Sequence, residues 1–114
     1  MTKKKQRSWE LGLGPVQLKP GEKRLIDVQP KLLFRAEKIM SGDHNADLHL
    51  SKLFVGKEET LKLNGDTINL ARTEIELESQ LWSQPEYPIS VEIENRGKNE
   101  RTVWLGIFGQ ARLQ

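Results

Sequence analysis

Glutamates recur at every second position in two short runs of the sequence. Glu74, Glu76 and Glu78 would share one face of a strand. Glu92 and Glu94 would share one face of a second strand. Two carboxylates on neighbouring strands can supply the acid and the base of glycoside hydrolysis. Same-face positions lie about 7 Å apart along a strand, however, and surface strands commonly carry charges. We therefore interpret both runs as solvated strand faces.

The segment Asp43 to Asp47 begins like a calcium-binding loop, with oxygen-bearing side chains at alternate positions. Such a loop needs a glycine where Leu48 stands and a bidentate glutamate where Phe54 stands. His44 and His49 form a candidate zinc pair, but no clear third ligand accompanies them. We expect a polar loop here, and neither a metal nor another cofactor.

Other catalytic patterns are missing from the sequence. The chain has no cysteine, so cysteine nucleophiles, thiolate metal sites and disulfides are excluded. No serine lies in a nucleophile-elbow pattern. The Gly12-Leu-Gly14 segment lacks the third glycine and the helix of a dinucleotide site. We expect that the protein is not an enzyme.

The last strand-like run, from Arg101 to Gly109, is apolar on both faces. One face, with Leu105 and Ile107, can fill a core. Trp104 and Phe108 line the opposite face, where large aromatic side chains need a second layer or another molecule to cover them. The sequence therefore predicts that Trp104 and Phe108 form an interface.

Trp82 and Tyr87 flank a proline-bearing segment that we expect to be an exposed loop tip. Flat rings at loop ends can stack on sugars or on a peptide. A carbohydrate-binding or peptide-binding module that uses these two aromatics is the alternative function.

The N-terminus is basic, whereas the rest of the chain is mildly acidic. Lys3, Lys4, Lys5 and Arg7 are four of the 18 basic residues, and the remainder counts 14 basic against 16 acidic residues. We expect residues 1–8 to be a flexible basic arm and residues 9–114 to be a single domain. Such an arm can contact nucleic acid or an acidic protein through interactions that salt weakens.

Glycine and proline punctuate the chain at intervals of about eight to ten residues, a spacing typical of short strands. Clean apolar and polar alternation indicates sheets with one dry and one wet face. The sequence therefore predicts an all-β fold of about eight strands, an antiparallel β-sandwich, jelly-roll or related Greek-key. Asn64-Gly65, between two apolar runs, predicts a hairpin turn. The expected inward residues include Ile26, Phe34 and Val55, and Met40 is expected on the same strand face as Phe34.

Several turn and strand segments resemble those of small β-sandwich structural proteins encoded among bacteriophage virion genes. These segments are Leu11-Gly-Leu-Gly-Pro15, Pro20-Gly21, Val28-Gln-Pro30, Leu33-Phe-Arg-Ala-Glu37, Val91-Glu-Ile-Glu-Asn95 and Gly106-Ile-Phe-Gly109. The resemblance implies a virion component that contacts copies of itself or a major capsid protein. It brings no catalytic residues.

Taken together, these patterns favour a non-enzymatic virion structural or assembly protein. We expect it to self-associate, or to decorate a larger shell, through the apolar sheet face that carries Trp104 and Phe108. We expect no membrane contact, because no apolar run approaches the roughly 20 residues that cross a bilayer. The expected location is the virion if a phage encodes the protein, and otherwise the cytoplasm.

Overall fold

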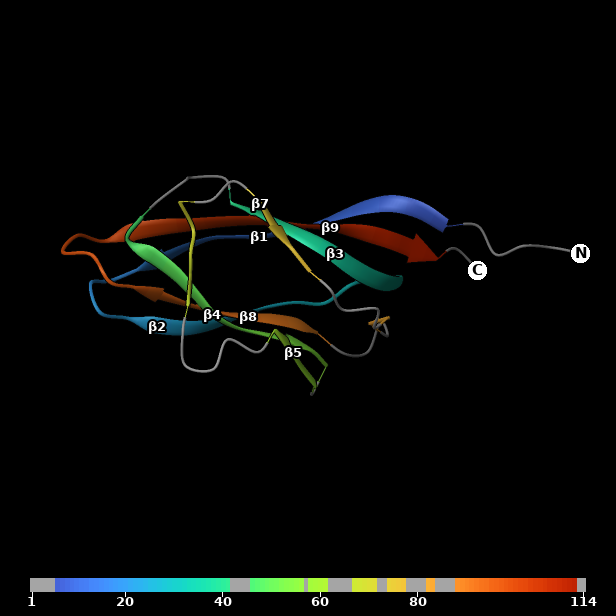
Figure 1. Ribbon diagram of the computed structural model, residues 1–114, viewed down its shortest axis with the longest axis horizontal. Coiled ribbons are helices and arrows are strands. Elements are labelled where there is room, and N and C mark those ends of the chain that lie inside the picture. The colour runs from blue at the N-terminus through green and yellow to red at the C-terminus, as the bar shows by residue number, and fades with distance from the viewer. Residues whose placement is uncertain are drawn as a thin grey trace, which may run out of the picture.

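The protein is built from two antiparallel sheets that face one another, as the computed structural model shows (Figure 1). The structure describes residues 6–41, 46–56, 58–61, 67–71, 74–77, 82–83 and 88–112. Within these ranges there are nine strands and no helix, which confirms the all-β sandwich. The strands are β1 (Gln6–Leu18), β2 (Lys23–Val28), β3 (Leu33–Ser41), β4 (Leu48–Val55), β5 (Glu58–Leu61), β6 (Ile68–Asn69), β7 (Glu74–Glu76), β8 (Ile89–Asn95) and β9 (Arg101–Arg112).

The strand order is that of a jelly roll. One sheet, called here the β9 sheet, has the order β1-β9-β3-β7. The other, called the β8 sheet, has the order β2-β8-β4-β5, and β6 also pairs with β4. The first strand thus pairs with the last, β2 with β8, and β3 with β7. This scheme is a long hairpin rolled into two layers, and β9 lies between β1 and β3.

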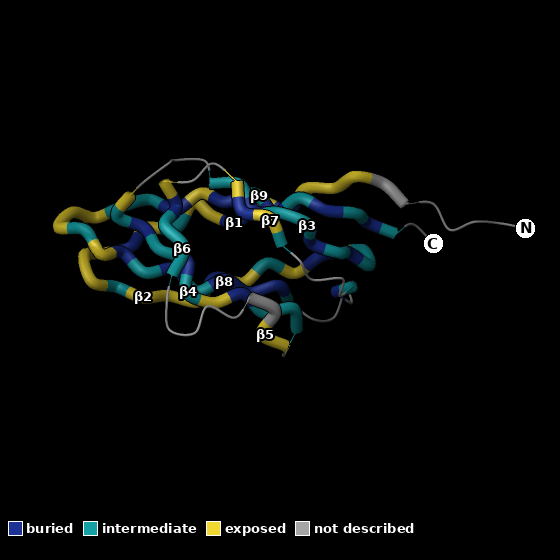
Figure 2. Tube along the Cα trace, in the orientation of Figure 1, coloured by how far each residue is buried: buried dark blue, intermediate teal, exposed yellow. Residues whose placement is uncertain are grey.

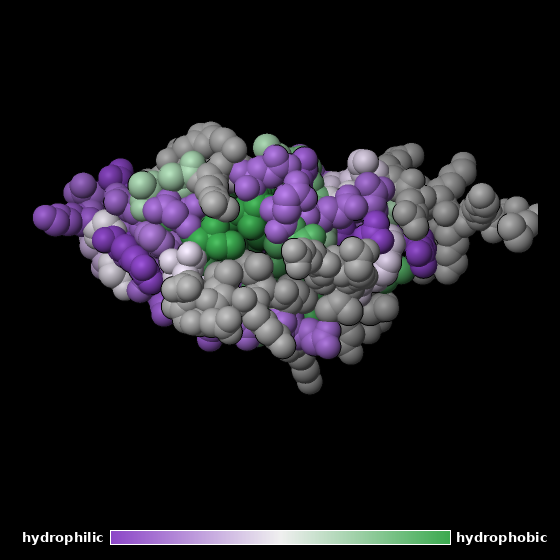
Figure 3. Space-filling model, viewed as in Figure 1, coloured by the Kyte–Doolittle hydropathy of each residue, from purple (hydrophilic) through white to green (hydrophobic). Residues whose placement is uncertain are grey.

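The core lies between the two sheets, and buried residues alternate with more exposed ones along the longer strands (Figure 2). The predicted inward residues Ile26, Phe34, Leu105 and Ile107 are all buried, but Val55 is only partly so. Seen from one side, hydrophilic residues cover most of the described surface, and hydrophobic residues gather near the middle (Figure 3). The other buried hydrophobic residues are Leu11, Leu13, Leu18, Ala36, Ile39, Leu48, Leu50, Leu53, Leu70, Ile75, Ile89, Val91, Ile93, Val103 and Ala111.

A β-bulge in β3 reverses the predicted orientation of the second half of that strand. The pairing of β3 with β9 shifts between Ala36 and Lys38, which leaves Glu37 as the extra residue. Beyond the bulge Ile39 is fully buried and Met40 is partly exposed, so the prediction that Met40 shares the face of Phe34 was wrong. Strict alternation fails at a bulge because one inserted residue moves every later side chain to the other face.

The predicted hairpin at Asn64-Gly65 was also wrong. Strands β5 and β6 both pair with β4 in the antiparallel sense, so they run in the same direction along one edge of β4. They are successive parts of an edge strand and not two arms of a hairpin. Residues 62–66 themselves lie outside the described residues.

The first strand begins earlier than the sequence suggested. Gln6, Arg7 and Ser8 pair with β9, opposite Arg112, Ala111 and Gln110 respectively. Residues 6–8 of the expected arm therefore belong to the sheet, while residues 1–5 lie outside the described part of the chain. Gly14, predicted to end this strand, instead lies within it at a bulge between Leu13 and Val16, with a φ of 94°.

Asn95 joins the two turns at one end of the sandwich. Its buried side-chain amide donates to the carbonyl of Leu18 at 3.0 Å and to that of Asn99 at 2.8 Å. Its side-chain oxygen accepts from the backbone N–H of Gly97 at 2.9 Å. These bonds satisfy the polar atoms of a buried amide and connect the end of β1 to the β8–β9 turn.

The backbones of β9 and β3 approach most closely at Gly109. A Cβ added at Gly109 would overlap the backbone carbonyl of Arg35 and lie 3.0 Å from the Cα of Ala36. Both are backbone atoms, so relief requires the two strands to move apart. At Gly12, on the neighbouring strand β1, an added Cβ would meet nothing within 4 Å.

We predict that Gly109→Ala lowers the free energy of unfolding by about 1–3 kcal/mol or more, the usual cost of forcing an atom into a packed core. At protein concentrations low enough that the chain is monomeric, the matched control Gly12→Ala is expected to be neutral or stabilising by about 0.5 kcal/mol, because alanine is favoured over glycine within a strand. Urea denaturation of both variants checks this. Equal stability of the two variants would contradict the close approach.

Candidate interaction face

The outer face of the β9 sheet carries the two aromatic residues that the sequence assigned to an interface. Along β9, Leu105 and Ile107 are buried in the core, so the alternating residues Trp104, Gly106 and Phe108 point outward. Trp104 is 50% exposed and Phe108 is half-buried. Half of Trp104 thus stays uncovered, and the residue lies on an inner strand of the sheet and not on a loop.

Phe108 lies in a row of side chains that crosses the sheet. Its cross-strand partners are Glu10 on β1 and Lys38 on β3. The Lys38 ammonium lies 5.9 Å from the Phe108 ring centroid and 2.9 Å from a carboxylate oxygen of Glu74 on β7. The hydrogen bond to Glu74, and then its charge, raise the pKa of Lys38. Phe108 is thus flanked by one fixed cation and by carboxylates.

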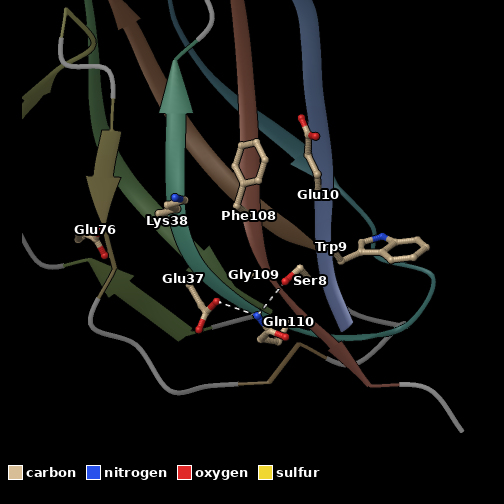
Figure 4. Close-up of a pocket in the computed structure, with 9 residues that line it drawn as sticks. All are labelled: Ser8, Trp9, Glu10, Glu37, Lys38, Glu76, Phe108, Gly109 and Gln110. Atoms are coloured by element: carbon tan, nitrogen blue, oxygen red, sulfur yellow. Dashed lines mark hydrogen bonds between the residues drawn. The ribbon is translucent and has the colours of Figure 1, made fainter. Parts of the chain in front are cut away.

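An open hollow of about 610 Å³ surrounds this row (Figure 4). Within it the Gln110 side-chain amide lies 3.3 Å from a Glu37 carboxylate oxygen and 3.5 Å from the Ser8 hydroxyl. Trp9, 39% exposed, lies at the β1 edge and points away from the other residues of the hollow. The lining residues are Ser8, Trp9, Glu10, Glu37, Lys38, Glu76, Phe108, Gly109 and Gln110.

A second hollow, of about 270 Å³, lies beside Trp104. The cross-strand partners Gly12 and Gly106 bring no side chain to this face, so the floor is bare backbone at Gly12, whereas the Phe108 ring and the Glu10 carboxylate lie over Gly106. Trp104 and Phe108 stand at the two ends of the hollow along β9, and Met40 of β3 lies on one side. The outer face therefore presents a protruding indole next to a depression with an apolar lining.

The sequence located the aromatics but missed the glycine floor. Gly12 lies within β1. The spacing of Trp104, Gly106 and Phe108 at alternate positions already puts Gly106 on the aromatic face. The pairing of Gly12 with Gly106 depends on strand register, which the local sequence does not reveal.

The Trp82 ring is less available for stacking on a ligand than the ring of an exposed loop tip. It is half-buried beside Ser83, which forms an isolated bridge with Phe34. The guanidinium carbons of Arg35 and Arg112 lie 5.2 Å and 4.5 Å from its ring centroid. Tyr87, its predicted companion, lies outside the described residues.

The predicted glutamate runs are placed as follows. Glu74 and Glu76 are exposed on β7, and Glu78 lies outside the described residues. On β8, Glu92 accepts a hydrogen bond from the Ser51 hydroxyl at 2.7 Å. Glu94 pairs with Arg96 at 2.6 Å, and this hydrogen bond lowers the pKa of Glu94.

The remaining candidates are the histidine pair and the basic arm. His44 lies outside the described residues, as do Lys3, Lys4 and Lys5, and the side chain of Arg7 is not described either. His49 Nδ1 lies 2.9 Å from the Thr67 hydroxyl oxygen.

Among the described residues, no three histidine, aspartate, glutamate or cysteine side chains form a group that could hold a metal. The same residues contain no helix long and apolar enough to cross a membrane.

We predict that His49 makes the protein less stable in mild acid. Burial, followed by the nearby charge of Arg96, lowers the pKa of His49 below its usual 6.5, while Glu94 opposes the shift. The unfolded chain then binds the proton more tightly, so the stabilising contribution is present above pH 6.5 and lost as pH falls through the folded-state pKa.

His49→Gln keeps a polar partner for Thr67 and removes this titration. Urea midpoints measured at neutral and at mildly acidic pH should fall less for the variant than for the wild type. An equal fall in both proteins would show that His49 does not contribute.

In comparisons with known proteins, no family model, curated protein or solved structure matches this chain.

Proposed function

We propose that this chain is a non-enzymatic assembly protein that self-associates through the outer face of the β9 sheet. The observation that carries the proposal is the half-exposed indole of Trp104 on an inner strand of that sheet. Trp104 follows Val103, which pairs with Val16 of β1, and precedes Leu105, which pairs with Leu13 of β1 and Ser41 of β3, so paired residues hold it on both sides along the strand. An aromatic anchor on a rigid element is typical of the centre of a protein interface.

The exposed apolar surface of Trp104 and its neighbours is large enough to drive association. A tryptophan side chain buries up to about 250 Å² when it is fully covered. Covering the exposed half of Trp104 at about 25 cal/mol per Å² yields about 3 kcal/mol per copy. Phe108 and Met40, both partly exposed beside Trp104, would add to this.

The composition of the face also supports an interface. Trp104, Phe108 and Met40 form an apolar centre over the middle strands. Charged side chains surround it, among them Glu10 on β1 and Lys38 with its partner Glu74 across β3 and β7. An apolar core with a polar rim is the usual anatomy of protein interfaces.

The size of the face is that of a small interface. The four strands of the β9 sheet have 13, 12, 9 and 3 residues. At about 3.3 Å per residue and about 4.8 Å per strand they cover about 590 Å². This is about three quarters of the roughly 800 Å² per partner of a standard interface.

The virion as the setting rests on the resemblance to bacteriophage structural proteins and on an analogy of fold. Jelly rolls build viral capsid domains, but they also build lectin domains. Fold therefore does not choose between an assembly protein and a carbohydrate-binding module. The exposed face favours assembly, because Trp82, the aromatic that a loop-based sugar site would use, already contacts two guanidinium groups.

The proposal predicts that Trp104→Ala weakens self-association at least about 100-fold, since each copy loses about 3 kcal/mol and 1.4 kcal/mol corresponds to tenfold. Light scattering coupled to size-exclusion chromatography, over a series of protein concentrations, measures the change against a monomer mass of 13.1 kDa. The matched control is Leu25→Ala, because Leu25 is 49% exposed on β2 of the opposite sheet.

The control variant should associate like the wild type. A wild-type protein that stays monomeric at every concentration would overturn the proposal. The same conclusion follows if Trp104→Ala and Leu25→Ala associate equally well.

A further inference from the structure

We infer that the partner on this face is a second copy related by a twofold axis, with Trp104 of each copy seated in the hollow over Gly12 of the other. This inference rests on the proposed function and specifies its geometry. A twofold interface must be complementary to itself, because the same patch serves both subunits. The outer face of the β9 sheet meets that condition, since it carries both a protruding indole and an adjacent depression.

The hollow has the size that an indole requires. Its volume is about 270 Å³, and a protein cavity of about 150 Å³ already accommodates benzene. The open part of the floor is the backbone of Gly12, where an added Cβ meets nothing within 4 Å, whereas the Phe108 ring and the Glu10 carboxylate lie over Gly106. A flat aromatic ring can therefore lie against the sheet at Gly12, between Trp104 and Phe108 of the same hollow.

The spacing along β9 determines the symmetry. Trp104 and Gly106 are successive outward positions, about 7 Å apart along the strand. An axis that lies in the interface and crosses β9 at the level of Leu105 exchanges these two positions. The two β9 strands then run antiparallel, face to face, and the two indoles lie side by side about 7 Å apart, within the range of favourable aromatic pairs.

Glycine usage provides an independent argument. Glycine within a strand weakens the sheet and often marks a site where another backbone or a ligand approaches closely. Gly14 and Gly109 are explained inside the protomer, because an added Cβ would overlap the carbonyls of Val103 and Arg35. Gly12 has no such reason, since an added Cβ meets nothing within 4 Å. A ring from a second copy would account for the open space above Gly12.

The decisive experiment mixes two variants. One lacks the protruding indole, and in the other the hollow is filled. Trp104→Ala removes the indole and leaves the hollow open. Gly12→Leu keeps the indole and fills the hollow, and the open space around Gly12 should leave the fold intact. Each variant alone should associate at least about tenfold more weakly than the wild type. The equimolar mixture should recover dimers. The Trp104 indole of the Gly12→Leu subunit enters the open hollow of the Trp104→Ala subunit. At the second contact, the introduced leucine faces the shortened side chain at position 104.

Native mass spectrometry identifies the mixed dimer, since the two variants differ in mass. The matched control is Asp27→Leu, which adds a leucine to an exposed position of β2 on the opposite sheet. This change should not dissociate the dimer, and the Asp27→Leu variant should not restore dimers when it is mixed with Trp104→Ala.

Circular dichroism gives a second measurement on the unmodified protein. Two indoles about 7 Å apart should produce an exciton couplet that grows with protein concentration.

The outcomes separate this geometry from the proposed function. If Trp104→Ala dissociates the protein while Gly12→Leu associates normally, self-association through this face stands and the seating in the hollow is wrong. A mixture that recovers no dimer leads to the same conclusion, as does a wild-type dimer without the couplet. If Trp104→Ala has no effect on association, both proposals fail.

Discussion

The pairing of β9 with β1 and β3 is the constraint on which the rest of the molecule depends. The last strand lies between the first and the third, so the β9 sheet is complete only when both ends of the chain have come together. This position requires an apolar inner face, which Leu105, Ile107 and Ala111 provide. It also requires a small residue where β3 bulges toward β9, and Gly109 meets that need.

The same position explains why the aromatic face is suited to contact. From Leu105 to Arg112, β9 has a partner strand on each side, so its outer side chains there lie away from the edges of the sheet. Trp104 directly precedes this stretch and lies on the same outer face. A partner that covers it buries side chains and does not have to extend the sheet, which makes shape the main source of specificity.

Sequence periodicity predicted the layers and the aromatic face well, but not the register. Alternation along β9 correctly separated inward Leu105 and Ile107 from outward Trp104 and Phe108, because β9 keeps a regular pleat. The same reasoning failed at Met40, since the bulge near Glu37 changes the phase without a local signal. The hollow could not be predicted either, because it depends on the pairing of Gly12 with Gly106, which lie in the first and the last strand of the chain.

Charge on the β9 sheet is better suited to orienting a partner than to supplying binding energy. Lys38 and Glu74 form an exposed ion pair between neighbouring strands, and such pairs contribute only about 0–1 kcal/mol. The exposed half of Trp104 represents about 3 kcal/mol by area. The apolar contribution to the binding free energy is therefore the larger one. In the proposed contact, the surrounding charges would select among the orientations that cover the indole.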